Sequence, residues 1–186
     1  NAIIHVLRCF DNDNIVHVDG NVNPIRDKET IDIELQLKDL ETIEKRLEKV
    51  KRAAKTGNKE AQAEEALLNR IREALLQAKS ARTIVPQNND EEVLLESFQL
   101  ITAKPVLYVC NVDESSAVNG NKYVDQVREL VKDEEAEVII LSVGAEADIT
   151  ELESYEERQV FLEDMGLTEP GASVLIQQLE ALLLQY

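Results

Sequence analysis

A helical spacing of apolar residues, interrupted once, constrains the fold of this chain more than any other feature. From about Lys28 apolar side chains recur every three or four positions, and the spacing resumes after Thr56-Gly57-Asn58. Such spacing marks one face of an α-helix, and Gly57 suits the left-handed residue that ends one. Two helices of about 20 to 27 residues joined by so short a turn must run antiparallel. The sequence therefore predicts a coiled-coil-like hairpin over 28–85, with this apolar face: Ile33, Leu37, Leu40, Ile43, Leu47, Val50, Ala54, Ala63, Leu67, Leu68, Ile71, Leu75 and Ala78.

Short, nearly continuous apolar runs on both sides of the hairpin predict β-strands. Runs of this kind are typical of strands covered on both faces of a parallel sheet. Amphipathic segments follow the runs, and a strand–helix–strand order implies parallel strands with right-handed crossovers. We therefore predict an α/β fold with an inserted helical hairpin. The expected strands are Ala2–Cys9, Pro105–Cys110 and Glu137–Leu141, and the expected helices are 90–100 (capped by Asp90), 123–134, 149–165 and 171–184.

The charge and cysteine content exclude several classes of protein. A formal net charge of −17 argues against a protein that coats nucleic acid or an anionic membrane over its whole surface. The two cysteines, Cys9 and Cys110, lie far apart and inside apolar runs, which predicts small core residues in a reducing cytosol. No stretch approaches the roughly 18 apolar residues that span a bilayer.

Polar residues directly after two predicted strands form the best candidate binding site. Asn111 and Glu114 follow one strand, and the small residues Ser142, Val143 and Gly144 follow the next. Ligands of open α/β sheets lie at the carboxyl ends of the strands. An amide can donate and accept while a carboxylate accepts, so the pair suits the edge of a purine. The alternative is that Asn111 and Asp113 are simply turn formers.

A resemblance to a known family favours the purine-binding interpretation. Asn111-Val112-Asp113-Glu114 resembles the Asn-x-x-Glu motif of the Obg-like ATPases, the YchF subfamily of P-loop GTPases. Similar segments lie in one register along almost the whole chain, and the hairpin falls where that family inserts its coiled-coil domain. The other matching segments are residues 2–10, 14–18, 100–111, 146–152 and 165–171.

The resemblance implies a role for each residue of the two loops. Asn111 would hold the edge of the purine ring, and the Val112 backbone would hydrogen-bond to it. Glu114 replaces the Asp that accepts from guanine in ordinary GTPases, and its longer side chain weakens the match to guanine. ATP, or else GTP, is thus the expected nucleotide. Ser142-Val143-Gly144 would pack on the other side of the base, through backbone contacts because Val143 departs from the usual Ala and no Lys follows.

The phosphate-binding motifs of the family are not found among the 186 residues. Neither Gly-x-x-x-x-Gly-Lys-Ser/Thr nor the Mg²⁺-side Asp-x-x-Gly occurs. The resemblance places both upstream of Asn1, so we expect a fragment with an incomplete sheet that is marginally stable or relies on association. Residues 1–27 would supply a strand and a connection, 28–85 the hairpin, and 86–186 the second half of the nucleotide-binding domain. Mg²⁺-dependent hydrolysis is implied for the complete protein, with no catalytic residue or metal ligand here.

A cluster of basic residues near the hairpin turn reverses the sign of the overall charge. One interpretation is a basic tip that touches RNA phosphates, for example on a ribosome, without base recognition because aromatic residues are lacking there. The other is a solvated helical face with some i,i+4 pairing. The whole chain could also be a non-enzymatic interaction module for RNA or protein. The cluster consists of Lys45, Arg46, Lys49, Lys51, Arg52, Lys55 and Lys59, with Glu48 the only acid between them.

The remaining chemically active side chains favour structural interpretations. His5 lies within an apolar strand and is expected to be a core or edge residue, while His17 has no assigned role. The carboxylates of residues 151–157 lack a partner His or a metal-ligand spacing, which predicts a solvated acidic helix.

Overall fold

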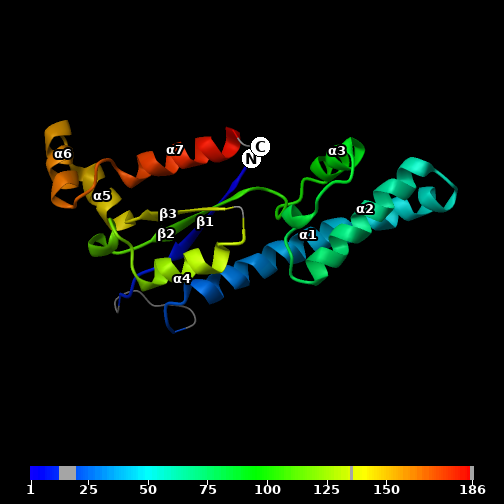
Figure 1. Ribbon diagram of the computed structural model, residues 1–186, viewed down its shortest axis with the longest axis horizontal. Coiled ribbons are helices and arrows are strands. Elements are labelled where there is room, and N and C mark those ends of the chain that lie inside the picture. Colours follow the sequence, from blue (N-terminus) through cyan, green and yellow to red (C-terminus); the bar gives the residue numbers. More distant parts are fainter. Residues whose placement is uncertain (13–19, 135, 185–186) are drawn as a thin grey trace. The chain divides into compact units, whose positions relative to one another are not determined.

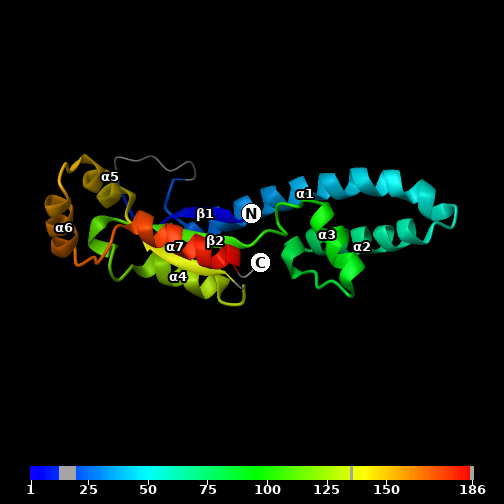
Figure 2. The same cartoon turned by 90° about the horizontal axis from the view of Figure 1, so that it is seen from above.

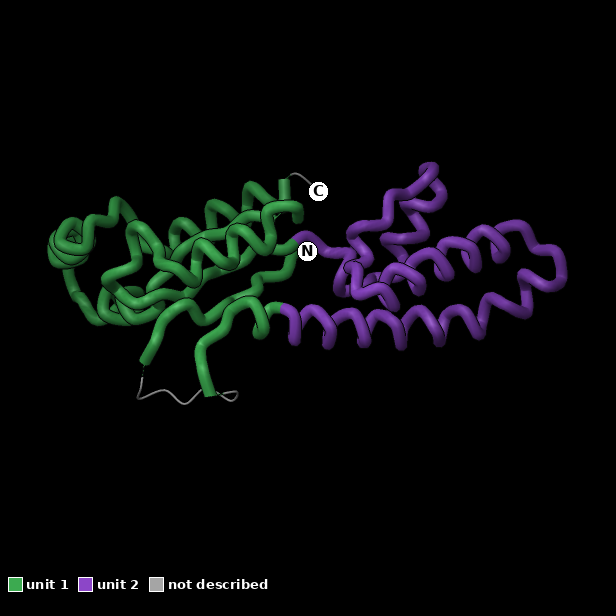
Figure 3. Tube along the Cα trace, turned by 60° about the horizontal axis from the view of Figure 1, so that its bottom comes forward, with its two compact units in different colours: residues 1–28, 106–186 green, residues 29–105 purple. Residues whose placement is uncertain are grey.

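The computed structural model describes residues 1–12, 20–134 and 136–184, which divide into two compact units (Figure 3). One unit consists of Asn1–Lys28 and Val106–Tyr186, and the other of Glu29–Pro105. The first boundary falls inside helix α1 (Pro24–Lys55), and the second lies just before a strand. The helical unit thus extends past residue 85.

A parallel sheet forms the centre of the first unit (Figure 1). Its strands are β1 (Ile3–Arg8), β2 (Val106–Asn111) and β3 (Glu137–Leu141), in the order β1-β2-β3. Arg8 lies beside Asn111, and Asn111 lies beside Leu141, so the carboxyl ends of the strands meet at one edge. The predicted α/β class is confirmed, and each strand differs from its predicted bounds by at most one residue at either end.

Two helices cover opposite faces of this sheet (Figures 1 and 2). Helix α4 (Lys122–Val131) packs Val124 and Val127 into a core with residues of β1 and β2. Helix α7 (Gly171–Leu184) packs Leu182 into a second core with β2 and β3. Burial of β2 on both faces explains its nearly continuous apolar sequence.

A glycine and a carboxylate hold the start of α7 in place. Glu146 accepts hydrogen bonds from the backbone N–H groups of Gly171 and Ala172, at 2.6 and 3.2 Å. A Cβ atom on Gly171 would lie only 2.0 Å from Leu141 Cδ1. At this close approach of α7 to the end of β3, a side chain at position 171 would fit only if the Leu141 side chain moved.

The second unit contains the predicted antiparallel hairpin of α1 and α2 (Lys59–Leu76), which lie side by side in Figure 2. Gly57 has a φ of +85° at the turn, and Asn58 caps α2 by accepting from the Ala61 N–H at 3.0 Å. The interior combines Ile43 and Leu47 with residues of α2 and with Phe98, which follows α3 (Asn89–Ser97). The 3₁₀ turn η1 (Ala81–Thr83) joins α2 to the segment before α3.

Helix α1 is longer than predicted, because residues 24–27 were expected to belong to a connection and instead form its first turn. Asn23 caps the helix by accepting a hydrogen bond from the Arg26 N–H at 3.1 Å, and Pro24 occupies the first helical position. Proline suits that position because its missing N–H would have no partner there. The Asn23-Pro24 pair therefore begins a helix instead of belonging to a connection that ends at Asp27.

Two further predictions about helices were wrong. Asn88, not Asp90, caps α3, because its side chain accepts from the Glu91 N–H at 2.9 Å. The helix predicted over 149–165 is two helices, α5 (Val143–Glu151) and α6 (Tyr155–Asp164). A capping box between Ser154 and Glu157 begins α6 and separates them.

Candidate functional site

The side chain of Asn111 joins the two segments that were predicted to hold a base. Its Oδ1 atom accepts a hydrogen bond of 3.1 Å from the Val143 N–H at the start of α5. The Val112 N–H donates to the Leu141 carbonyl oxygen at 2.9 Å, which adds a second link between the strand ends. Among the described residues the Asn111 amide nitrogen has no hydrogen-bond partner, so both of its N–H groups are available to a ligand.

Val112 has less freedom to bind a ligand than its position suggests. Its side chain is buried in the core of the sheet and its N–H is committed to Leu141. A hydrogen bond from a bound base to the backbone of this residue would therefore be accepted by the Val112 carbonyl oxygen.

The Glu114 carboxylate lies close to the first turn of α5. A Cβ atom on Gly144 would stand 3.6 Å from Glu114 Oε1, so the absence of a side chain at Gly144 keeps that space open. Both residues are exposed. The unpaired N–H groups at the start of a helix carry partial positive charge, which favours a carboxylate there.

Asp113 has a structural role between Asn111 and Glu114. It caps the 3₁₀ turn η2 (Glu114–Ser116), accepting from the Ser116 N–H at 2.9 Å and the Ser115 hydroxyl at 3.0 Å. Hydrogen bonding, chiefly with Ser116, holds the pKa of Asp113 below its ordinary value. This cap directs the chain so that Glu114 begins the turn.

The segment predicted as a loop of small residues is the start of a helix. The Ser142 side chain is buried and accepts from the Ala145 N–H at 3.3 Å, which caps α5. Val143 is 48% exposed and Gly144 is also exposed. Ser142 therefore holds the helix in place, while Val143 and Gly144 present backbone and apolar surface.

Asn121 is a residue of this edge that no sequence pattern had singled out. Its amide nitrogen donates to the Cys9 carbonyl oxygen at 2.7 Å, and its Oδ1 atom caps α4 by accepting from the N–H groups of Tyr123 and Val124. The Cys9 N–H in turn donates to the Asn111 carbonyl oxygen at 2.7 Å. The position of Asn121 before an amphipathic helix could have indicated the cap, but not the link to β1.

The other candidate residues lie away from this edge or inside the core. His5 is buried, with its ring centroid 5.6 Å from that of Tyr108. Cys9 and Cys110 are buried thiols, and hydrogen bonding between them raises the pKa of Cys9 and lowers that of Cys110. Residues 14–18, with His17, lie outside the described residues. Across the described ranges no three His, Cys, Asp or Glu side chains gather to hold a metal ion.

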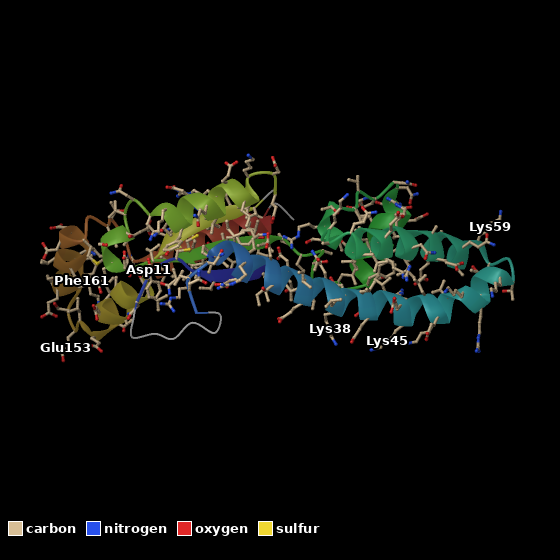
Figure 4. The ribbon with its side chains drawn as sticks, turned by 90° about the horizontal axis from the view of Figure 1, so that it is seen from below. Asp11, Lys38, Lys45, Lys59, Glu153 and Phe161 are labelled. Atoms are coloured by element: carbon tan, nitrogen blue, oxygen red, sulfur yellow. The ribbon has the colours of Figure 1, made fainter. Side chains whose placement is uncertain are left out.

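The basic residues of the hairpin divide into paired and unpaired groups. Arg46 forms an ion pair with Glu64 of α2 at 2.5 Å, and Lys45 forms an exposed pair with Glu41 at 3.7 Å. Figure 4 shows Lys45 projecting from α1 and Lys59 near the turn. Within the part of the chain that the structure describes, the other five make no ion pair: Lys49, Lys51, Arg52, Lys55 and Lys59.

Sequence comparison finds close relatives of this chain, although no family model matches it. The chain is 44% identical over 184 residues to the ribosome-binding ATPase YchF of Bacillus subtilis, covering 98% of this chain and 50% of that protein. It is 42% identical over 176 residues to YchF of Escherichia coli O157:H7, covering 95% and 48%. The Obg-like ATPase 1 of Xenopus laevis is 33% identical over 190 residues, covering 100% and 48%.

Comparison with solved structures finds a relative of the same name. The YchF GTPase of Schizosaccharomyces pombe matches with a TM-score of 0.81 and 29% identity, over 97% of this chain and 50% of that one. The chain spans about half the length of the curated relatives that it matches. None of the described helices combines the length and the apolar character needed to cross a bilayer.

Proposed function

Since this chain belongs, over the length that it spans, to the family of YchF and Obg-like ATPases, we propose that it binds the purine base of a nucleoside triphosphate. The observation that carries the proposal is the hydrogen bond from the Val143 N–H to Asn111 Oδ1. It commits the acceptor of the amide and leaves its two N–H groups for a ligand. Adenine and guanine both present N7 as an acceptor, so Asn111 would recognise a purine without distinguishing the two.

Glu114 supports ATP as the preferred nucleotide. Its carboxylate only accepts hydrogen bonds, and it lies beside the first turn of α5 near Gly144. The extra methylene of Glu, relative to Asp, moves that acceptor away from the position that would meet the N1 and N2 groups of guanine. The backbone of Val143 and Gly144, with the Val112 carbonyl oxygen, would complete the surroundings of the base.

The phosphate chemistry is a proposal for the complete protein and not for these residues. The relatives are named as ATPases, and Mg²⁺-dependent hydrolysis of the terminal phosphate is the activity that membership implies. No residue of this segment is assigned to Mg²⁺ or to catalysis. We propose that residues 1–28 and 106–186 belong to the nucleotide-binding domain and that 29–105 are its helical insertion, because Phe98 and Leu100 pack with the hairpin.

Calorimetric titration with ATP and GTP tests the base site. Replacing Asn111→Ala removes the donors to the purine and is expected to weaken binding of both nucleotides about tenfold, the value of roughly one hydrogen bond. The matched control is Asn119→Ala, an exposed amide close by that should leave affinity unchanged. Unchanged affinity for Asn111→Ala would refute the base site and favour a non-enzymatic interaction module.

The helical unit supports a second proposed role, contact with RNA phosphates. The unpaired lysines and Arg52 near the turn carry uncompensated positive charge on a chain of net charge −17. The Bacillus and Escherichia relatives are named as ribosome-binding. We accordingly propose the ribosome as the partner and the cytoplasm as the compartment.

Strand β1, the outermost described strand on one side of the sheet, supports a proposal about association. In β1 the side chains of Ile4 and Val6 are 41% and 56% exposed, although they alternate with buried residues of the same strand. A further strand added beside β1, with its own covering helix, would remove them from water. Covering them would be favourable because buried apolar surface stabilises by about 25 cal/mol per Å².

A further inference from the structure

A cleft on the helical unit lies among the basic residues of α1 and carries chemistry beyond electrostatic attraction. Its volume is about 490 Å³, and it is bounded by α1, by α2 and by the residue that follows α3. Val50 and Phe98 form its apolar side, and Lys45, Arg46 and Lys49 bring positive charge. All of these residues belong to one compact unit.

Arg46 is held in a fixed position inside this cleft. Its guanidinium carbon lies 4.6 Å from the centroid of the Phe98 ring, and its Nε atom donates to Glu64 at 2.5 Å. Phe98 is only 4% exposed, so its ring cannot itself receive a ligand. The Arg46 side chain is 37% exposed and therefore remains accessible. A planar guanidinium supported from behind by an aromatic ring can stack on a flat, unpaired base.

The lysines beside Arg46 suit the phosphates that accompany such a base. Lys45 and Lys49 are exposed and four positions apart on α1, which separates them by about 6 Å along the helix axis. Glu41 is the only ion-pair partner of Lys45 among the described residues, and exposed pairs of this kind contribute little. The carboxylate at the cleft, Glu64, is neutralised by Arg46 and would not repel an anion strongly.

We propose that this cleft holds one unstacked base of single-stranded RNA. The base stacks on the Arg46 guanidinium, and the neighbouring phosphates bind Lys45 and Lys49. The inference rests on the proposed contact of the helical unit with RNA. Charge alone would give a contact with the RNA backbone, and the cleft adds the binding of one base. Charge would serve an acidic peptide equally well, but a supported guanidinium plane and an apolar side favour a flat ring.

Fluorescence anisotropy of the full chain with matched oligonucleotides tests the proposal. Oligoadenylate RNA is compared with an abasic oligonucleotide of equal phosphate number. The wild-type chain should bind the oligoadenylate roughly five- to tenfold more tightly, as one stacked base would provide. Arg46→Lys keeps the charge but removes the plane and should abolish the difference. Lys49→Gln should weaken both ligands by the same factor. A 2-aminopurine in the oligonucleotide reports the surroundings of the base directly, and its fluorescence should change on binding to the wild-type chain and to Lys49→Gln but not to Arg46→Lys.

The results of these measurements distinguish the base cleft from the proposed electrostatic contact with RNA on which it rests. Equal affinity of the wild-type chain for both oligonucleotides, or an unchanged difference in Arg46→Lys, would overturn the base cleft and leave the electrostatic contact intact. Failure to bind either oligonucleotide would overturn both. Displacement of the RNA by polyglutamate of matched charge as effectively as by unlabelled oligoadenylate would assign the cleft to acidic peptides instead. Circular dichroism of Arg46→Lys checks that the hairpin remains folded.

Discussion

Asn111 Oδ1 accepts a hydrogen bond of 3.1 Å from the backbone N–H of Val143, thirty-two positions further along the chain. One side chain thus connects the end of β2 to the first turn of α5. The bond also fixes which end of the amide is free, because the acceptor is engaged and the donors are not. The proposed role of Asn111 has two parts, holding the start of α5 and binding the purine, and experiment can separate them.

Asn111→Asp should separate the hydrogen bond that holds the start of α5 from the binding of the purine. A carboxylate still accepts from the Val143 N–H but offers no donor to purine N7, and its charge repels the nucleotide phosphates. We expect affinity for ATP and GTP to fall at least about tenfold while the free energy of unfolding changes by less than about 0.5 kcal/mol. Calorimetry and denaturant unfolding measure the two quantities. Retained nucleotide affinity would show that the amide donors are not used.

Glu114→Asp should shift preference towards guanine. The shorter side chain returns the acceptor to the position of an ordinary GTPase aspartate. A charge-assisted hydrogen bond of this kind should raise affinity for GTP relative to ATP by about tenfold. Glu114→Gln is the control, because it keeps the length and removes the charge. A ratio of GTP to ATP affinity that does not rise in Glu114→Asp would contradict the role of side-chain length.

Gly171→Ala tests the close packing of α7 on β3. Alanine is the better helix former, so propensity alone predicts stabilisation. The new Cβ atom would stand 2.0 Å from Leu141 Cδ1, and we expect the overlap to prevail with a destabilisation of about 1–3 kcal/mol. Chemical denaturation measures this cost. It should become smaller when Leu141→Ala provides room, and a cost that persists in the double variant would place the strain elsewhere.

Reversing charges near the hairpin turn should change the salt dependence of RNA binding. Each phosphate that is no longer bound reduces the slope of log affinity against log salt by about 0.7 for a single strand, so four fewer bound phosphates would reduce it by about 3. The test variant carries glutamate at Lys49, Lys51, Arg52 and Lys55. The control variant carries glutamate at four exposed positions elsewhere: Lys79, Lys122, Arg128 and Lys132. An equal reduction of the slope in both variants would indicate a general effect of net charge.

The sequence predicted the elements of this fold better than their ends. The hairpin followed from a long apolar period, and the strands from short apolar runs, because both patterns reflect burial. The ends depended on single side chains with two meanings. Asn23 and Asn88 are typical of turns, yet each accepts a backbone N–H one turn into a helix. The same residue type therefore indicated a connection where a helix had already begun.

The candidate site, too, could be predicted from the sequence only in part. Strand order was enough to predict that Asn111 and Val143 would lie at the same edge. The commitment of the Val112 N–H to Leu141 and the link from Asn121 to Cys9 depend on register and could not be predicted from spacing. Phe98 is the clearest omission. It lies far from the basic cluster in sequence but packs under Arg46, so aromatic residues were expected to be lacking where one is present.

The pairing of β1 with β2 sets an order of events for folding. Arg8 lies beside Asn111 in the sheet, and the helical unit occupies most of the chain between them. Local contacts form quickly, whereas distant parallel pairing must first overcome the entropy of closing a long loop. We expect α1 and α2 to associate early and to shorten the effective loop that β1 must close. The end of the sheet that carries Asn111 then assembles last, so helix content should return before nucleotide binding during refolding.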